Sequence, residues 1–437
     1  MKVSSFTATV ALALCSVVKG SPVASSADQT LGTHVSGGDT YIVLFNNSRP
    51  SVSSVSNVLS RIDLHPDHED VHMVWNGSQL RGFCANMKAH CIDALNGMDD
   101  VAIVEKSQTI SVSRTQTTSG APWGLARISS PGDVIFNSTR LQYTYTYDAV
   151  NPQTLPGAGA DIYSIDTGIN TEHVSFGGRA KMIWPNSTGD DMGHGTHTAG
   201  TAGARTFGVA FGANVFGLKA LDKNGVGQTP TMVDAIQFAT RNHRTRSRTP
   251  GFVGSVMNLS FSMFRADASL NNPTAMQFAI DAAINAGMHV VVASGNEYLT
   301  DSCLTDPASS GGATGRAISV GSVGMKNMLS DFSNTGACTD IYAPGEDIVS
   351  TWVTAPNSVK PDSGTSMSAP HVAGIVAYLM VEKPELAKDP VAMKKYLLDT
   401  SLKAMIKVPA GKEVPKNDAL LLVNNGQNVE NGFISRG

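Results

Sequence analysis

A serine with the surroundings of a catalytic nucleophile lies in the segment 364–374 (GTSMSAPHVAG). Ser366 stands where a loop meets apolar residues at helical spacing, among them Val372, Ile375 and Val376. A serine at a helix N-terminus lies beside unpaired backbone N–H groups, which would stabilise an alkoxide or an oxyanion. Many serines at this position only cap their helix. A catalytic role therefore requires a base and an acid elsewhere in the chain.

Both partners occur upstream. Asp166 ends the apolar run 160–166, which predicts a carboxylate at the carboxyl end of a buried strand. His194 lies in the glycine-rich segment 191–200 (DMGHGTHTAG), which leads into a helix. A serine hydroxyl is inert at neutral pH until a base takes its proton. We therefore expect Ser366 to be the nucleophile, His194 the general base and then acid, and Asp166 the carboxylate that orients the imidazole.

Two alternatives share the histidine motif. His197 lies three residues after His194 and could itself be the base. The two histidines could also bind a metal ion, but a zinc peptidase helix needs the pattern HExxH, and no glutamate follows His194. A metal site is therefore disfavoured. A further polar residue, Asn296, follows the apolar run 290–293 and either caps that strand or donates its amide to a bound ligand.

Four blocks, in this order, resemble the subtilisin family of serine peptidases: 166–168 (DTG), 194–197 (HGTH), 294–296 (SGN) and 364–371 (GTSMSAPH). The segment 121–130 (APWGLARISS) resembles the mature N-terminus of the family's proteinase K-like fungal branch. The similarity covers about residues 41–426. It implies that the first histidine, His194, is the catalytic imidazole. It also implies that Asn296 and the backbone N–H of Ser366 donate to the oxyanion.

The resemblance also implies a substrate-binding segment. Ser260, Phe261 and Ser262 fall where the family has an exposed strand edge that pairs with the backbone of the peptide substrate. This chain has Ser262 and Met263 where the family has two glycines. The larger side chains would reshape the specificity pockets, and we expect an endopeptidase that prefers apolar or aromatic residues.

The chain divides into four parts by pattern. From residue 121 onward strands at 160–166, 215–221, 253–260, 288–293 and 317–323 alternate with helices, which predicts an α/β fold with a three-layer parallel sheet. Helices are expected to begin after Thr231, Asn272 and Asp389. The predicted division is a signal peptide (1–20), a propeptide (21–116), a subtilisin-like peptidase domain (117–426) and a tail (427–437).

The propeptide prediction rests on a βαββαβ pattern at about 40–113, typical of a small ferredoxin-like α+β domain. It resembles the inhibitory propeptides that precede subtilisin-type domains, and an ordinary N-terminal binding domain is the alternative. The polar segment 111–120 is expected to be a linker that is cut on maturation. The mature chain is then expected to begin between Thr115 and Ala121.

The N-terminal residues predict secretion, because a basic residue precedes an apolar run too short to span a bilayer. A net charge of −4 argues against nucleic acid and anionic membranes as partners. The expected partners are protein and peptide substrates and the chain's own propeptide, and we expect a monomer. No cofactor is required for the chemistry.

Five cysteines are present. Cys15 leaves with the signal, Cys84 and Cys91 fall in the propeptide, and Cys303 and Cys338 are expected to form a disulfide, a pairing that resembles one in fungal relatives. Glycosylation sequons stand at Asn46, Asn76, Asn137 and Asn186, and a further sequon at Asn258 is expected to be buried.

Calcium is expected as a structural ion. Asp340 matches a calcium ligand of proteinase K, although the neighbouring loop at 309–316 carries extra residues.

The sequence therefore predicts a secreted serine endopeptidase, made as an inhibited zymogen, that works through an acyl-enzyme on Ser366. The first alternative is a non-catalytic relative that binds peptides. The second, an esterase or lipase, would carry the pattern GxSxG, which the segment 364–368 does not fit.

Overall fold

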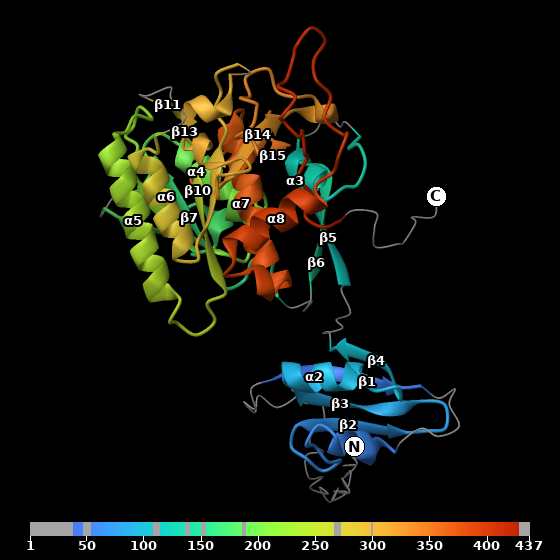
Figure 1. The fold of residues 1–437 in the computed structure, drawn as a ribbon. Coiled ribbons are helices and arrows are strands. Elements are labelled where there is room, and N and C mark those ends of the chain that lie inside the picture. The colour runs from blue at the N-terminus through green and yellow to red at the C-terminus, as the bar shows by residue number, and fades with distance from the viewer. Residues whose placement is uncertain are drawn as a thin grey trace, which may run out of the picture. The chain divides into compact units, whose positions relative to one another are not determined.

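The structure, a computed structural model, describes residues 38–46, 54–107, 114–135, 140–149, 154–185, 189–265, 272–298 and 300–427. The predicted signal peptide and the tail beyond residue 427 lie outside the described residues. The chain forms two compact units, residues 1–110 and 111–437 (Figure 1).

In its described residues, the first unit is a four-stranded antiparallel sheet with two helices. Its elements are β1 (Asp39–Phe45), α1 (Val55–Ser60), β2 (Val71–Asn76), β3 (Arg81–Met87), α2 (Ala89–Asn96) and β4 (Val101–Lys106). The sheet order is β2-β3-β1-β4, and the βαββαβ order is the predicted one. Val43 and Phe83 from the sheet and Leu59 and Leu95 from the helices are fully buried together. The unit therefore has a hydrophobic core of its own.

The second unit is built on a seven-stranded parallel sheet in the order β15-β14-β12-β10-β7-β9-β8. The strands are β7 (Ala160–Asp166), β8 (Ala180–Trp184), β9 (Asn214–Lys219), β10 (Gly254–Leu259), β12 (His289–Ala293), β14 (Ile318–Val323) and β15 (Ile341–Pro344). Each of the five strands predicted from the sequence is present, with bounds that differ by at most two residues. The predicted α/β class is confirmed.

Helices cover both faces of this sheet. Ile162 of β7 faces the helices α4 (His194–Gly203), α7 (Thr365–Glu382) and α8 (Pro390–Thr400). The next residue, Tyr163, faces α5 (Thr229–Arg246) and α6 (Ala275–Asn285). Because successive side chains of a strand point to opposite faces, a nearly continuous apolar strand supplies both cores. The result is the predicted three-layer arrangement (Figure 1).

Shorter elements complete the second unit. They are β5 (Arg114–Ala121), α3 (Trp123–Ile128), β6 (Tyr143–Ala149), β11 (Met263–Phe264), β13 (Thr305–Asp306), β16 (Ile348–Thr351), β17 (Val359–Asp362) and five single turns of 3-10 helix at 174–176, 302–304, 308–310, 325–327 and 384–386. Among the described residues, no helix combines the length and the apolar character needed to cross a membrane.

Two predicted helix starts are wrong and one is confirmed. α5 begins before Thr231, at Thr229, with Gln228 as its N-cap. α6 is capped not by Asn272 but by Thr274, whose hydroxyl accepts from the N–H of Gln277 while the Gln277 side chain accepts from the N–H of Thr274. This reciprocal capping box satisfies two free donors at once, which one asparagine side chain would not do. Asp389 caps α8 as predicted.

The predicted linker at 111–120 is also corrected. From Arg114 onward the chain forms β5, which pairs with β6 in antiparallel register. The polar composition of β5 hid a strand whose β-branched threonines favour extended structure. Its partner alternates strictly, with Tyr143, Tyr145 and Tyr147 buried. The compact units divide between 110 and 111, so β5 belongs with the second unit.

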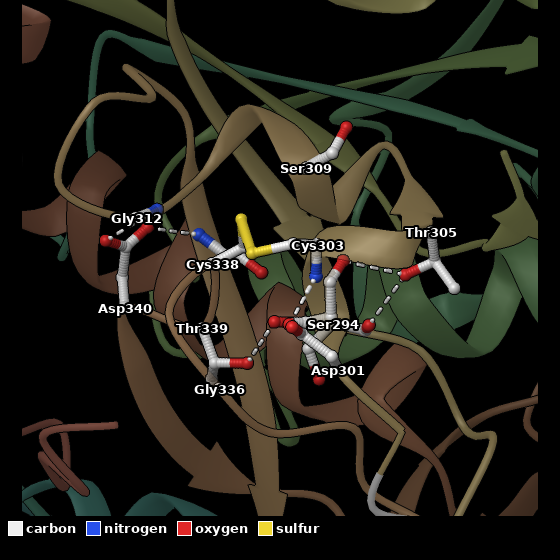
Figure 2. Close-up of a disulfide and its surroundings, with 12 residues drawn as sticks. Ser294, Asp301, Cys303, Thr305, Ser309, Gly312, Gly336, Cys338, Thr339 and Asp340 are labelled. Atoms are coloured by element: carbon white, nitrogen blue, oxygen red, sulfur yellow. Dashed lines mark hydrogen bonds between the residues drawn. A yellow bond between two sulfur atoms is a disulfide. The ribbon is translucent and has the colours of Figure 1, made fainter. Parts of the chain in front are cut away.

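The predicted disulfide between Cys303 and Cys338 is present, with the two Cα atoms 5.1 Å apart (Figure 2). It joins the loop after β12 to the loop before β15. The two other cysteines in the described part of the chain, Cys84 and Cys91, are buried free thiols.

Gly374 permits the close approach of two buried helices. A Cβ atom added at Gly374 would lie 2.6 Å from Cβ of Val209 and 2.9 Å from the carbonyl oxygen of Ala202, at the end of α4. An alanine in a helix normally stabilises it by about 1 kcal/mol relative to glycine. Overpacking a buried contact costs about 1–3 kcal/mol. The steric term is the larger one here.

We therefore expect Gly374→Ala to lower the free energy of unfolding in urea. Gly132→Ala is the matched control, because nothing lies within 4 Å of a Cβ atom built there. Equal stability of the two variants would show that α4 and α7 are not packed as described.

Candidate active site

Asp166 and His194 form a hydrogen-bonded pair at the carboxyl edge of the sheet. Nδ1 of His194 lies 2.7 Å from Oδ1 of Asp166. The carboxylate is fully buried, and it also accepts from the N–H of Thr167 at 2.7 Å and from the hydroxyl of Thr198 at 3.3 Å. An ionised carboxylate can only accept, so Nδ1 carries the proton. The other ring nitrogen, Nε2, is then left with a lone pair and can act as a base.

The loop before α4 fixes the position of His194. Asp190 accepts from the N–H groups of Gly193 and Thr196, both at 2.9 Å. Thr167 accepts from the N–H of Gly195 at 2.8 Å and donates its own hydroxyl to Asp190 at 2.9 Å. These bonds satisfy donors that the first turn of α4 leaves without helical partners. The carboxylate and the hydroxyl therefore hold the loop that presents the imidazole.

The protonation of His194 is set by opposing effects. Burial lowers the pKa of His194, but the charge and hydrogen bond of Asp166 raise it. Asp362 and Asp190 add smaller Coulombic effects in the same direction. The net result is a pKa of His194 above its ordinary value. The protonated imidazolium form of His194 is thus stabilised.

Ser366 is the second residue of α7 and is buried. Its hydroxyl donates to the backbone carbonyl of Ser260 at 2.9 Å. No hydrogen bond joins Ser366 to His194, and both of these residues are described. A rotation about the Cα–Cβ bond of Ser366 is the change that would turn its hydroxyl from the Ser260 carbonyl toward another acceptor.

A proline in α7 explains a second hydrogen bond between Ser366 and Ser260. Pro370 lies in the second turn of α7, since the helix begins at Thr365. Pro370 has no N–H to donate to the carbonyl of Ser366 four residues earlier. The hydroxyl of Ser260 donates to that carbonyl instead, at 3.0 Å. The serine is therefore fixed to the neighbouring loop through its own backbone.

Two hydrogen-bond donors face one small space beside Ser366. Oδ1 of Asn296 accepts from the N–H and from the hydroxyl of Thr365, both at 2.9 Å. The amide orientation is thereby fixed, because only Oδ1 can accept. A Cβ atom added at Gly364 would lie 3.5 Å from Nδ2 of Asn296 and 3.6 Å from the backbone nitrogen of Ser366. Glycine leaves open the space that an anionic oxygen would occupy between these donors.

The alternative base, His197, faces the interior. It is fully buried, and its Nε2 lies 2.9 Å from the carbonyl of Ile348 and 3.0 Å from that of Lys360. Burial lowers the pKa of His197 to about 4, so the ring is neutral. It joins α4 to β16 and β17. Another histidine of the motifs, His371, is also buried and bonded to a backbone carbonyl.

The predicted substrate-binding segment is only partly accessible. β10 lies between β12 and β7 in the sheet and is not an exposed edge. Ser260 is buried, while Phe261 and Ser262 are half-buried. The hydroxyl of Ser262 donates to Glu297 at 3.0 Å. The predicted exposed edge is therefore absent at Ser260, and of the three predicted residues only Phe261 and Ser262, where the chain has left the sheet, are partly accessible.

A lysine ammonium lies where the calcium ion was predicted beside Asp340. Nζ of Lys394 lies 2.9 Å from Oδ1 of Asp340. The described residues contain no cluster of three or more histidine, cysteine, aspartate or glutamate side chains that could hold a metal ion. The lysine was missed because its role depends on packing between elements that are distant in sequence.

The sequons have different environments. Asn76 is exposed at the end of β2 and Asn46 is half-buried after β1. Asn137 and Asn186 lie outside the described residues. Asn258 is buried as predicted, with its amide donating to Ser260.

The positioning residues Thr365, Asp190, Thr167 and Thr198 were not identified from the sequence. Thr365 is adjacent to the predicted nucleophile and Thr167 to the predicted acid. The hydroxyl beside Ser366 and the hydroxyl beside Asp166 were visible signals. Their partners were not, because each partner comes from another segment.

The fold and this constellation define an α/β protein of the serine peptidase type, and the comparisons agree. The Subtilase family description matches residues 157–432. The chain belongs to the subtilase family.

Fungal subtilisin-like proteases are among its relatives. The chain is similar to the subtilisin-like serine protease Cur l 4.0101 of Cochliobolus lunatus, 35% identical over 371 residues, which are 81% of this chain and 69% of that protein. It is also similar to the subtilase-type proteinase psp3 of Schizosaccharomyces pombe, 35% identical over 391 residues, 84% of this chain and 79% of that one. The crystal structure of a cold adapted subtilisin-like serine proteinase matches 70% of this chain and 99% of its own, at 30% identity and a TM-score of 0.57.

The charge of Asp362 gives a test of the electrostatics. Asp362 raises the pKa of His194, so Asp362→Asn should lower that pKa. The His194 ring would then lose its proton at a lower pH in an NMR titration. Asp399→Asn is the control, since Asp399 is exposed on α8 and pairs with Lys395. An unchanged His194 titration in Asp362→Asn would show that the charge of Asp362 does not act on the imidazole.

Proposed function

We propose that this chain is a secreted serine endopeptidase that cleaves peptide bonds through an acyl-enzyme on Ser366. The observation that carries the proposal is the 2.7 Å pair of Asp166 and His194, in a fold whose Ser366 lies beside two convergent donors. Membership of the subtilase family supports the same reaction.

The first half of the reaction forms an ester. The hydroxyl of Ser366 leaves the carbonyl of Ser260 and gives its proton to Nε2 of His194 while Oγ attacks the peptide carbonyl carbon. The resulting imidazolium is stabilised by Asp166, which already accepts from Nδ1. His194 then gives the proton to the leaving amine, and the C–N bond breaks.

The second half hydrolyses the ester. Water gives a proton to His194 and attacks the acyl carbon, and the proton returns to Oγ of Ser366 as the C–O bond breaks. In both halves the negative oxygen lies between Nδ2 of Asn296 and the backbone N–H of Ser366.

The reaction should depend on pH through His194. Since the imidazole must be neutral to act as a base, peptidase activity should fall as pH falls through the raised pKa of His194.

The second candidate function is peptide binding without cleavage. The hydrogen bond from Ser366 to Ser260 favours it, because a serine held in this way is not poised against a base. The intact Asp166–His194 pair, with two donors at the site, favours the peptidase.

We further propose that the first unit is an inhibitory propeptide. It has its own core and a βαββαβ fold, and the predicted cleavage region lies near the division at residues 110 and 111. A cut after residue 116 would remove part of β5, whereas a cut at 108–113 would leave β5 intact. Secretion accords with the Cys303–Cys338 disulfide.

Labelling with a fluorophosphonate tests the nucleophile. The secreted protein is treated with the probe, and the adduct is located by mass spectrometry while the mature N-terminus is recorded. We expect an adduct on Ser366 and a new N-terminus between residues 108 and 121. Ser366→Ala should lose the label and keep the two units joined. A folded, processed chain that takes no label would favour the binding protein.

The oxyanion donors are tested by Asn296→Ala. The donor acts on the charge that develops in the transition state, so kcat for a peptide substrate should fall by about 10²–10³-fold, a value known from subtilisin. Asn417→Ala, at an exposed asparagine, is the control and should retain full activity. A kcat within about threefold of the parent would exclude Asn296 from this role.

A further inference from the structure

A lysine ammonium occupies a ring of oxygen atoms in the second unit. Nζ of Lys394 donates to the backbone carbonyls of Gly312 at 2.8 Å, Gly315 at 2.9 Å and Ala317 at 2.8 Å. Oδ1 of Asp340 lies 2.9 Å from the same nitrogen. Three backbone carbonyls and one carboxylate oxygen thus surround a single positive charge. We call these four oxygen atoms the oxygen cage.

The cage is buried. Lys394 and Asp340 are each only 8% exposed. The carboxylate of Asp340 also accepts from the N–H groups of Gly312 at 3.1 Å and Ser319 at 2.9 Å. Burial raises the pKa of Asp340 to about 6, against the opposing effects of Lys394 and these amides. A buried carboxylate and converging carbonyls require a positive charge, because unpaired they would be costly.

Helix α8 holds the backbone of Lys394, which carries this positive charge, in a fixed position. Asp389 caps the helix by accepting from the N–H groups of Val391 at 3.1 Å and Ala392 at 2.9 Å. Met393 and Leu397 on the same helix are buried in the core. The lysine backbone is therefore anchored on both sides, and its side chain reaches the cage without reorganisation.

The chemistry of the cage is that of a cation site. Calcium takes six to eight oxygen ligands, carboxylates and carbonyls among them, at about 2.3–2.6 Å. The four distances of 2.8–2.9 Å fit an ammonium donating hydrogen bonds. A cavity of about 470 Å³, lined in part by Lys394, Asp340, Gly312 and Gly315, adjoins the cage. It offers an entry path and space for water ligands.

We propose that the Lys394 ammonium is a permanent internal cation of the oxygen cage, and that without it the cage would bind Ca²⁺. The resemblance to proteinase K led us to expect a calcium ion at this position. In this chain the positive charge is supplied by Lys394 of α8 instead. The inference does not rest on peptidase activity.

The cage supports the segment that leads to the candidate active site. The loop that supplies its carbonyls follows β13, where the hydroxyl of Thr305 donates to the carbonyl of Ser294 at 3.2 Å. Ser294 precedes Asn296 by two residues. Figure 2 shows Thr305, Ser294 and the Cys303–Cys338 disulfide in one cluster with Gly312 and Asp340. We therefore expect loss of the cation to loosen this cluster.

Thermal unfolding of the full chain tests the proposal. All proteins carry Ser366→Ala, so that no peptidase activity can degrade them. Lys394→Ser removes the ammonium and leaves room for a metal ion. Lys395→Ser is the matched control on the same helix, because Lys395 is exposed and pairs with Asp399 at the surface. Each protein is melted in excess EDTA and in millimolar CaCl₂.

We expect the parent and Lys395→Ser to respond to calcium equally. Lys394→Ser should have a Tm several degrees below that of Lys395→Ser in EDTA and should regain part of the loss in CaCl₂. A calcium response of Lys394→Ser no larger than that of the control would overturn the proposal, since Lys394 would then be an ordinary buried ion pair.

If Lys394→Ser does not fold in EDTA, it is produced and purified in CaCl₂ throughout. Folded protein under that condition alone supports the proposal. The absence of folded protein under both conditions overturns it, because a cage able to accept Ca²⁺ would have been filled.

Discussion

The complete burial of α7 is the constraint on which the candidate site depends. Residues 365–380 are all buried, so the helix lies inside the unit, against α4 and the sheet. Its direction and depth are then set by packing contacts such as that between Gly374 and Val209. The packing of α7 therefore also fixes the position of Ser366, which is the second residue of the helix. The nucleophile is thus placed by the hydrophobic core.

The polar side of the site is held by hydrogen bonds that each orient one functional group. Thr365 fixes the amide of Asn296, Asp190 holds the loop of His194, and Asp166 fixes the imidazole tautomer. All these donors and acceptors are supplied by loops at the carboxyl ends of parallel strands or by the first turns of helices, where backbone groups lack partners. The hydrogen bonds that these positions require for stability are also the ones that orient the reacting groups.

The sequence predicted five of the seven strands of the second unit's sheet, because these buried strands are mostly apolar runs, and it did not name β8 and β15. It also identified Asp166 and His194, which the structure joins, and the Cys303–Cys338 pair. It missed the strand β5, whose polar residues resemble a linker until their pairing with the tyrosines of β6 is seen. It placed a metal ion at Asp340 because Lys394 is 54 positions further along the chain, and only the packing of α8 brings it there. Spacing along the chain reports local structure, and contacts between distant elements require the fold.

The oxygen cage also bears on how stability depends on surroundings. A bound ion stabilises a fold by RT ln(1 + [L]/Kd), so its contribution varies with the free ion concentration and vanishes on dilution. The charge of Lys394 is covalently attached to the chain, so the oxygen cage keeps its cation however far the protein is diluted. Such a contribution varies instead with proton activity, through the ionisation of Asp340. Because burial raises the pKa of Asp340 from its ordinary value to about 6, the folded chain binds a proton there more tightly than the unfolded chain, and the free energy of unfolding should rise as pH falls through this range. Where a metal-dependent protein would respond to chelators, this part of the fold would respond to pH.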